Sequence, residues 1–288
     1  MPIDAFRSIL FCPKCLSGLT NKDDGLMCSN CNLNYYIYDG KYFIVCEEVY
    51  LRYQKEAKIG FTNSLKGILR RFPNFYYFFF FLLTPITPFG FTARKSLRSI
   101  PRNSGLIVNI GSGTKRIRSD VLNLDILPLP NVDIVAEATK LPFRDNSLDM
   151  VISEATLEHL PEPQKAIAEI RRVLKPGGLV YATAPFLYPF HESPNDYFRW
   201  TKEGLIKEFA DFSPIKIGIW SGPTSAVISF LMHYFAIIFS FGWSKLYLTL
   251  SYMFMVVLAP LKILDLFFLL FHYSENISSV FYFLGKKK

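Results

Sequence analysis

The chain has 288 residues, half of them hydrophobic, with 28 phenylalanines and a formal net charge of +8. This length leaves room for one medium domain and a small one. The charge suits an anionic membrane surface or nucleic acid, and because the apolar residues are clustered we favour the membrane. The first residues, MPIDAFRSILFCPKC, contain no apolar stretch long enough for a cleavable signal peptide. We therefore expect the five cysteines to belong to a reducing compartment.

Two C-x-x-C pairs stand near the amino terminus with twelve residues between them. Each pair can place two thiolates on one tight turn, and two such turns complete a tetrahedral zinc site with no open position. We predict a structural zinc ion held by Cys12, Cys15, Cys28 and Cys31, which stabilises a domain too small to fold on its core alone. Redox-active or incidental pairs are the alternative, and Cys46 is expected to be a small buried side chain.

The segments ILFCPKCLSGL and GLMCSNCNLNYYIYDGKYFIV carry more than the cysteines. They resemble the zinc ribbons of the small activator proteins of tRNA methyltransferases, and the Tyr-rich stretch before Asp39-Gly40 matches the hairpin of those ribbons. The resemblance implies a zinc ribbon over residues 1–48. It leaves the function open, because such ribbons are also fused to unrelated enzymes, and it makes the ribbon a candidate docking element for a protein partner.

Residues 49–104 show no strand alternation. Apolar residues recur at helical spacing between Leu65 and Phe72, with lysine and arginine on other faces, which predicts a basic interfacial helix. The run FYYFFFFLL (75–83) would reach only about 15 Å as a helix, half of a bilayer core. We predict a membrane-proximal helical linker that dips into the membrane, with a buried intramolecular helix as the alternative.

From residue 106 the pattern changes to short strands separated by turns or helices. Helices are expected at 164–174, where Lys175-Pro176-Gly177-Gly178 ends the first one, and at 201–212. The expected strands are 106–110, 121–126, 133–138, 148–153, 178–185 and 214–220. Such alternation predicts an α/β domain with a doubly wound, Rossmann-like sheet over residues 105–222.

The first strand-turn-strand segment, LIVNIGSGTKRIRSDVLNLDI (106–126), has the layout that brings backbone N–H groups and one carboxylate to a ribose. The third glycine of a dinucleotide motif is missing, and Asp125 comes only fourteen residues after Gly111. The intervening helix, residues 114–120, can have only about two turns. A ligand with a ribose and no pyrophosphate is therefore expected.

Four segments, NIGSG (109–113), NLDI (123–126), 135–160 and 169–185, resemble class I S-adenosylmethionine-dependent methyltransferases. The pattern is closest to the branch that includes ubiquinone and menaquinone biosynthesis methyltransferases. The resemblance implies a seven-stranded sheet and S-adenosylmethionine as the cofactor. The cofactor-binding residues that it implies are Asn109, Gly111, Ser112, Gly113, Asp125, Ile126, Glu137, Ala138, Thr139, Ser153 and Glu154.

The resemblance also implies individual roles. The two glycines would let the backbone approach the methionine part, and Asp125 would accept hydrogen bonds from both ribose hydroxyls. Glu137 would face the adenine amino group, while Ser153 and Glu154 would line the methyl-transfer mouth. Asn109 replaces the usual acid, so we expect a weaker contact with the cofactor's ammonium group.

Methyl transfer needs positioning more than acid–base help, but a hydroxyl acceptor requires a nearby base. Candidates follow the expected fourth and fifth strands, on the carboxyl edge where ligands bind. They are Glu158-His159, and His191 with Asp196, Tyr197 and Arg199. An orienting role in its loop is an equal alternative for His159. Ala155 stands where some metal-dependent relatives carry a further Glu, so no catalytic metal is expected.

Two apolar runs, 223–241 and 246–260, follow the sixth strand. The second passes into a stretch that contains Lys262 and Asp265, and a continuous second span would place these charges at membrane depth, at high cost. We predict that residues 223–272 form a hairpin of two membrane-embedded helices with a third amphipathic piece. A helical pair buried within the protein is the alternative.

The segment VFYFLG (280–285) looks like the antiparallel seventh strand of this methyltransferase sheet, so residues 273–288 would close it. The apolar region is then an insertion between strands six and seven. Both of its ends must return to the cytoplasmic side, where the cofactor is, and the terminal lysines 286–288 agree with the positive-inside bias.

The leading functional hypothesis is a membrane-attached methyltransferase that acts on a lipid-linked glycan or another lipid-borne acceptor. A quinone- or isoprenoid-type small-molecule methyltransferase is the second enzyme hypothesis. A non-catalytic module that binds the cofactor or a partner is a third. Nucleic acid is disfavoured as a partner because the sequence has no RNA-reading motif that combines aromatic and basic residues.

Overall fold

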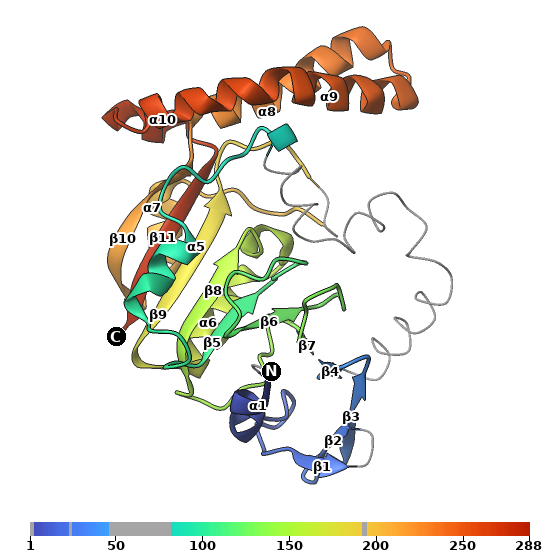
Figure 1. Cartoon of the computed structure of the whole chain (residues 1–288), viewed down its shortest axis with the longest axis vertical. Helices are drawn as coiled ribbons and strands as arrows, with labels where there is room; N and C mark the ends of the chain where they lie inside the picture. The colour runs from blue at the N-terminus through green and yellow to red at the C-terminus, as the bar shows by residue number, and fades with distance from the viewer. Residues whose placement is uncertain (1–2, 23–24, 46–81, 192–194) are drawn as a thin grey trace.

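The computed structural model describes residues 3–22, 25–45, 82–191 and 195–288, which Figure 1 draws in colour. The expected interfacial helix near Leu65, the apolar run as far as residue 81, and Cys46 lie outside these residues. Within the described part, one mixed sheet contains eleven strands in the order β1-β2-β3-β4-β7-β6-β5-β8-β9-β11-β10. The strands are β1 (Thr20–Lys22), β2 (Gly25–Cys28), β3 (Leu33–Tyr38), β4 (Lys41–Phe43), β5 (Ile107–Ile110), β6 (Val121–Asp125), β7 (Ile134–Val135), β8 (Leu148–Glu154), β9 (Leu174–Pro185), β10 (Phe212–Ser221) and β11 (Val280–Lys287).

The seven strands from β7 to β10 form the α/β core. Strands β7, β6, β5, β8 and β9 pair in parallel, and β11 lies antiparallel between β9 and β10. All residues of β5 and β6 are buried, as expected for parallel strands covered on both faces. The predicted doubly wound sheet is confirmed, including its antiparallel seventh strand at the end of the chain.

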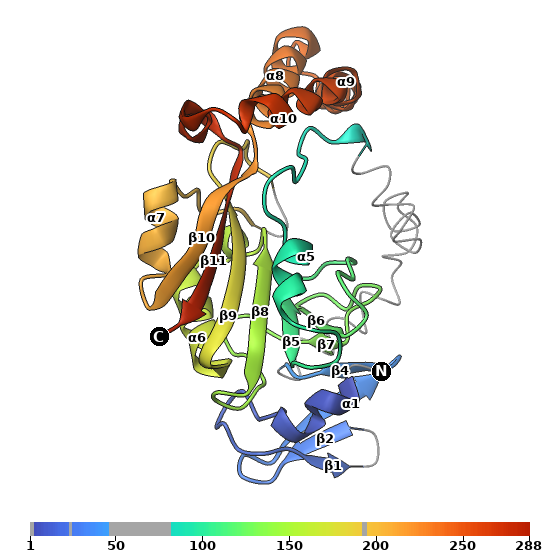
Figure 2. The same ribbon diagram turned by 60° about the vertical axis from the view of Figure 1, so that its left-hand side comes forward.

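Short helices cover the two faces of this core. Helices α6 (Pro163–Val173) and α7 (Lys202–Glu208) lie on one face, while α5 (Ala93–Ser96) lies on the other, as Figure 2 shows. Helix α6 buries Ala166, Ile167, Ile170 and Val173 against the sheet, which is the spacing of one helical face. The 3-10 turns η2 (Leu97–Ser99) and η3 (Leu157–His159) complete these layers.

The helix predicted over residues 114–120 is wrong, because this segment forms turns. Side chains from other segments use the carbonyl groups that a helix would need. Asn131 Nδ2 donates to the carbonyl of Thr114 at 3.0 Å, and Asn123 Nδ2 donates to that of Lys115 at 2.9 Å. These bonds hold the turn against the ends of β5 and β6 without any helical ladder.

The amino-terminal segment is continuous with the central sheet. After α1 (Ile3–Phe6) and η1 (Arg7–Ile9), strands β1 to β4 form an antiparallel meander. Strand β4 then pairs in parallel with β7, where the amide of Tyr42 donates to Asp133 and that of Ile44 donates to Val135. A further contact joins Leu10 to Phe143. The cysteine-bearing segment therefore extends the sheet at the β7 edge.

The apolar region between β10 and β11 forms a helical hairpin, which Figure 1 shows across one end of the sheet. It comprises α8 (Pro223–Ser240), α9 (Ser244–Leu258), η4 (Ala259–Leu264), α10 (Asp265–Phe268) and η5 (His272–Ile277). Within the described residues, Pro223–Ser240 and Ser244–Phe268 are long and apolar enough to cross a membrane, by length and composition only. The two helices pack side by side and are joined at Phe241 and Gly242.

The two charges inside this apolar region are used within the protein. Lys262 Nζ donates to the carbonyls of Leu82 and Thr84, at 3.2 and 2.8 Å. Asp265 is fully buried and accepts the backbone N–H groups of Thr224 and Ser225 at the start of α8. Both charged side chains therefore form hydrogen bonds within the protein and are not exposed on the surface of the hairpin.

Candidate functional site

The glycine turn after β5 lies at the carboxyl edge of the sheet. Gly111 has φ +62°, and a Cβ atom there would lie 2.2 Å from Thr156 Oγ1. Gly113 also has a positive φ, of 55°. Only glycine adopts this backbone readily and leaves room beside Thr156. The glycine at position 111 therefore lets the turn pack directly against the Thr156 side chain at this edge.

Asp125 ends β6 directly beside this turn. Its Oδ2 accepts the N–H of Gly113 at 2.8 Å, and its Oδ1 accepts the N–H of Leu127 at 2.9 Å. These two bonds fix the carboxylate at the strand end, where the resemblance expects it to meet a ribose. Asp125 pairs with Val135 of β7, so Glu137, Ala138 and Thr139 follow at the same edge.

The remaining predicted cofactor residues differ in their exposure. Ser112 and Ser153 are buried, and Ile126 is exposed. Asn109 is buried in mid-sheet, where its Nδ2 donates to Asn123 Oδ1 at 3.4 Å. This amide is therefore engaged with the neighbouring strand, and its predicted contact with the cofactor stays a prediction.

The structure adds Lys115 to this edge. Its Nζ lies 2.6 Å from Oε2 of Glu154, the last residue of β8. This ion pair joins the turn that follows Gly113 to Glu154, which is predicted to line the site of methyl transfer. Its sequence signal was its position near the missing third glycine.

These residues suit S-adenosylmethionine better than a dinucleotide. The turn over 114–120 presents no helix start to a pyrophosphate, while two glycines and a strand-end carboxylate remain. When bound, the cofactor supplies a methyl group on a sulfonium. We expect the chain's own contribution to be holding the ribose at Asp125 and orienting the acceptor.

A polar cluster from two loops lies at the same edge. The rings of His159 and His191 have centroids 5.0 Å apart. Asp196 accepts the N–H of His191 at 2.8 Å and pairs with Arg199 through both carboxylate oxygens. Burial alone would raise the pKa of Asp196, but the Arg199 and His191 hydrogen bonds outweigh it and lower the pKa to about 2. Four of the predicted catalytic residues therefore converge.

Tyr197 is the exception among the predicted catalytic residues. Its side chain is largely exposed, and its backbone N–H donates to the carbonyl of Glu158 at 2.8 Å. It thus contributes to the cluster through its backbone.

Glu158 is the least expected member of the cluster. Its side chain is 0% exposed, and neither carboxylate oxygen has a hydrogen-bond partner among the described residues. Burial raises its pKa to about 8. Glu158 precedes His159 in the sequence, but no local sequence pattern predicted that its carboxylate would be buried.

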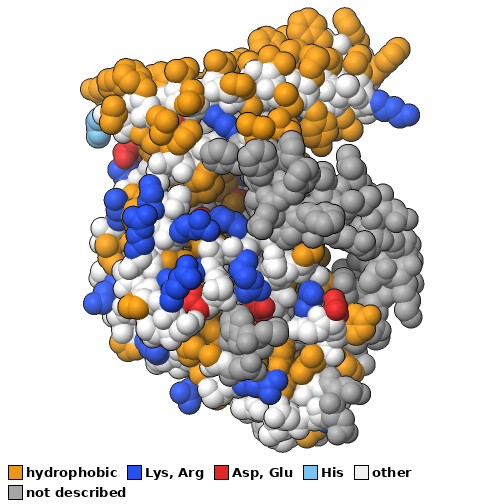
Figure 3. Space-filling view, in the orientation of Figure 1, with side chains coloured by type: hydrophobic (Ala, Val, Ile, Leu, Met, Phe, Trp, Pro, Cys, Tyr) orange, Lys and Arg blue, Asp and Glu red, His pale blue; other side chains and the backbone are white. Residues whose placement is uncertain are grey.

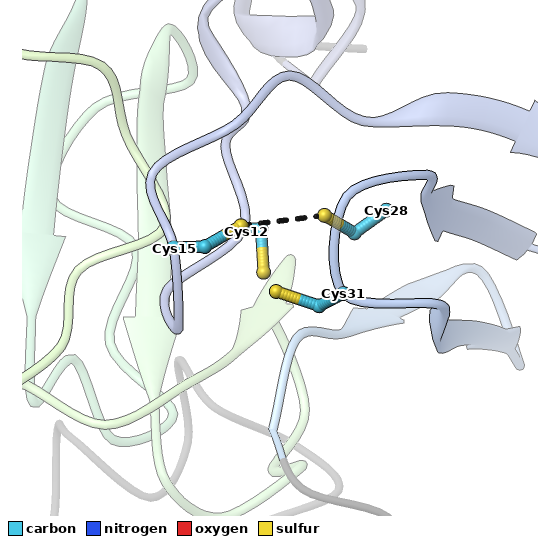
Figure 4. Close-up of side chains that lie close together, drawn as sticks. All are labelled: Cys12, Cys15, Cys28 and Cys31. Atoms are coloured by element: carbon cyan, nitrogen blue, oxygen red, sulfur yellow. Dashed lines mark hydrogen bonds between the residues drawn. The ribbon is translucent and has the colours of Figure 1, made fainter.

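The four cysteine side chains converge at the other end of the molecule, as Figure 4 shows. Their sulfur atoms all lie within 4.8 Å of one another, and Cys15 Sγ is 3.5 Å from Cys28 Sγ. Sulfurs in a tetrahedral zinc site lie about 3.8 Å apart, given a Zn–S distance of about 2.3 Å. None of the four forms a disulfide, and Tyr35 Oη contacts Cys12 Sγ at 3.1 Å as an outer partner. The donor set fits a closed zinc site.

A cavity of about 560 Å³ lies at the opposite edge of the sheet, lined by Phe6, Gly105 and Asp149 among others. Leu106 and Asp149 stand at the amino ends of β5 and β8. Ligands of open α/β sheets bind at the carboxyl ends of the strands. The predicted cofactor therefore does not belong in this cavity.

The central part of the chain is similar to known methyltransferases. Residues 112–182 match the methyltransferase domain family. A demethylmenaquinone methyltransferase of Renibacterium salmoninarum is 36% identical over 106 residues, which cover 32% of this chain and 44% of that protein. A ubiquinone/menaquinone biosynthesis C-methyltransferase of Pasteurella multocida is 34% identical over 112 residues, covering 37% and 41%. The chain thus spans less than half the length of these relatives.

Among solved structures, phosphoethanolamine N-methyltransferase 2 of Haemonchus contortus, in complex with S-adenosyl-L-methionine, has a TM-score of 0.48 and 18% identity. The likeness covers 79% of this chain and 58% of that chain. The family match over residues 112–182, together with the strand order and the glycine turn, shows that the α/β part of this chain contains a methyltransferase domain.

Proposed function

We propose that the protein is an S-adenosylmethionine-dependent methyltransferase that works at a membrane surface and methylates a lipid-borne acceptor, such as a lipid-linked glycan. The strand directions in the sheet are the main support for this proposal. Strand β10 is antiparallel to β11, which is antiparallel to β9, so β10 and β9 share one direction. Because α8 begins directly after β10, the hairpin leaves the sheet at its carboxyl edge, the same edge at which Asp125 and the His159–His191 cluster lie.

The hairpin supplies the surface that would meet lipid. Many of its large apolar side chains are exposed, and Figure 3 shows hydrophobic side chains gathered over the hairpin on the face in view. Exposed apolar areas of this extent mark interaction or membrane sites. The most exposed large side chains are Ile237, Phe241, Trp243, Tyr252, Val257, Ile263, Leu270 and Tyr273. Attachment here would hold the carboxyl edge at the height of a lipid headgroup.

A quinone- or isoprenoid-type acceptor is the second candidate. The similarity of the central segment to a demethylmenaquinone methyltransferase supports it. The non-catalytic alternative is disfavoured, because the convergence of His159, His191, Asp196 and Arg199 has no evident use in a module that only binds.

The cofactor half of the proposal is tested by calorimetric titration of S-adenosylmethionine into the full chain. We expect one site per chain, and Asp125→Ala to weaken binding at least about 100-fold, because charged hydrogen bonds to the ribose are lost. Asp211→Ala is the matched control, since its side chain is 69% exposed in a surface pair with Arg171. No binding by the unaltered chain would overturn the proposed activity.

The membrane half is tested by flotation with phosphatidylcholine vesicles, with and without anionic phosphatidylglycerol. The unaltered protein should float, and the double substitution Ile237→Glu with Val257→Glu should leave it in the aqueous fraction. Ile215→Glu, at an exposed position on β10, should float normally. If the unaltered full-length protein stays in the aqueous fraction, membrane attachment is contradicted, while the proposed cofactor binding is unaffected.

Labelled cofactor incubated with a total-lipid extract identifies the acceptor class. Label in a sugar-bearing lipid supports the first candidate, and label in a quinone supports the second. Label in neither, from a protein that binds the cofactor, would contradict both.

A further inference from the structure

We propose that Glu158, His159 and His191 form a binding site for a divalent transition-metal ion at the carboxyl edge of the sheet. The sequence argued against a metal here because Ala155 lacks a carboxylate. The structure supplies the third ligand from elsewhere, since His191 comes from the loop after β9. One ligand atom from each of the three side chains lies within 4.8 Å of the others.

The buried carboxylate is the first argument. Glu158 is fully buried, and both of its oxygens lack hydrogen-bond partners among the described residues. A buried, unpaired carboxylate is costly. Protonation would remove the charge but would still leave an O–H and a carbonyl oxygen without partners, which is also costly. A cation bound to the carboxylate resolves both problems.

The Nδ1 atom of each histidine lies against a polar group outside the proposed ligand set. Nδ1 of His159 contacts the carbonyl of Asn195, and Nδ1 of His191 lies 3.3 Å from Asp196 Oδ2. Metal-binding histidines commonly use one ring nitrogen in this way, which leaves the other for the ion. Nε2 of His159 lies 4.0 Å from Glu158 Oε1. Small rotations would bring the donors to the separation of about 3–3.5 Å that bonds of about 2.1 Å require.

The charges around the site are also compatible with a cation. Arg199 is a fixed positive group of this cluster, and Asp196 pairs with it through both oxygens. Asp196 is itself almost fully buried beside His191. The local balance therefore leaves the negative charge of Glu158 for the bound ion.

The ligand set indicates the class of ion. Two imidazoles and one carboxylate suit zinc, manganese, iron or cobalt better than calcium or magnesium, which prefer oxygen. Three protein ligands leave coordination positions open. An acceptor hydroxyl bound there would lose its proton to solvent more readily.

This catalytic use of the site rests on the proposed methyltransferase function. The acceptor oxygen would attack the sulfonium methyl, forming the O–C bond while the S–C bond breaks and its electron pair stays on sulfur. The metal site thus favours an oxygen as the methylated atom. Binding of the ion itself does not depend on this step.

Manganese titration of the full chain loaded with one zinc ion per chain, followed by electron paramagnetic resonance, tests the site, because the four thiolates take up the zinc and do not favour Mn²⁺. We expect one Mn²⁺ per chain. Glu158→Gln and His191→Ala should each weaken binding at least about 100-fold, and Asp196→Asn about 10- to 100-fold as an outer partner. His272→Ala, an exposed histidine away from the cluster, should bind as the unaltered chain does.

Two results would overturn the inference: no Mn²⁺ bound by the unaltered chain, or unchanged binding by both Glu158→Gln and His191→Ala. Thermal melting of each variant checks that it is folded. If Glu158→Gln does not fold, His191→Ala still tests the site. The same samples are titrated with S-adenosylmethionine. If the chain binds the cofactor but does not bind Mn²⁺, only the proposed metal site is contradicted. If it binds Mn²⁺ but does not bind the cofactor, only the proposed methyltransferase function is contradicted.

Discussion

Individual arginine side chains hold the segment after the glycine turn. Arg116 reaches the carbonyls of Val121 and Asn131 and pairs with Asp133 at 2.8 Å. Arg118 pairs with Asp120 and also donates to two carbonyls from an earlier part of the chain. Each guanidinium has five donors in a planar fork, so one side chain can satisfy several carbonyls. The hydrogen bonds of these two arginines therefore help to hold residues 114–120 in turns, where a short helix was expected.

The Arg118–Asp120 pair predicts a pH dependence. Burial would raise the pKa of Asp120, but hydrogen bonds from Arg118 and from the N–H of Asn103 outweigh burial and lower it. A carboxylate with a lowered folded-state pKa stabilises the protein above its unfolded pKa of about 3.9, and this is lost as the pH falls through the folded value.

Asp120→Asn should therefore cost about 1–3 kcal/mol of unfolding free energy at pH 7, and less as the pH falls from about 5 towards 2. Urea unfolding across this range measures the difference. Asp39→Asn is the control, because Asp39 is exposed and its positive φ of 49° tolerates asparagine. An equal cost of Asp120→Asn at pH 7 and at pH 3 would contradict the assignment.

At the scale of elements, α8 is tied to the rest of the hairpin through its first turn. The first N–H groups of a helix have no partner within it. Asp265, about forty residues later in the chain, accepts the N–H groups of Thr224 and Ser225 and the Ser225 hydroxyl. Gly222 allows this approach, since a Cβ atom there would lie 2.6 Å from the Asp265 carboxylate.

Asp265→Ala should reduce stability by about 1–3 kcal/mol, because it leaves the N–H groups of half-buried Thr224 and buried Ser225 without this acceptor. Asp265→Asn keeps one acceptor oxygen and should cost less. Denaturant unfolding of the protein in one fixed detergent compares the variants, with Asp211→Asn as the exposed control. Stability unchanged in Asp265→Ala would show that the helix start is satisfied in another way.

At the scale of the whole molecule, the cysteine-bearing segment and the α/β core share one sheet. Strand β4 covers the edge that β7 would otherwise expose, which is a common protection against edge-to-edge association. Residues Phe6, Ile9 and Cys12 belong to the same hydrophobic cluster as the core strands. A partner that binds the cysteine-bearing segment would therefore contact a segment that is already packed against the α/β core.

Removal of zinc should destabilise the edge of the core sheet that pairs with β4. A chelator that strips the predicted Cys12–Cys15–Cys28–Cys31 site should unfold the meander, because metal binding and folding are coupled in such sites. We expect faster hydrogen exchange at the amides of Tyr42 and Ile44, which bond to Asp133 and Val135. Phe281 and Phe283 of β11 should stay protected. Unchanged exchange at Tyr42 after measured zinc loss would mean that the metal does not stabilise this edge.

The sequence by itself determined the features that depend on short-range patterns. Alternating apolar runs predicted the strands from β5 to β10, and the last apolar segment predicted β11. The glycine turn before Asp125 pointed to a ribose-bearing ligand, and the cysteine spacing brought four thiols together as expected. Each of these features is encoded within a few residues or by their order along the chain, so no tertiary contact was needed to read it.

Only the tertiary structure decided the features that depend on distant partners. The carbonyls of Thr114 and Lys115 accept hydrogen bonds from Asn131 and Asn123, so the helix propensity of residues 114–120 could not decide the form of this segment. The charges at Lys262 and Asp265 are satisfied by backbone groups far along the chain. Burial of Glu158 depends on the fold that brings the His191 loop to it. Burial and hydrogen bonding between remote segments are properties of the packed molecule, which no local window contains.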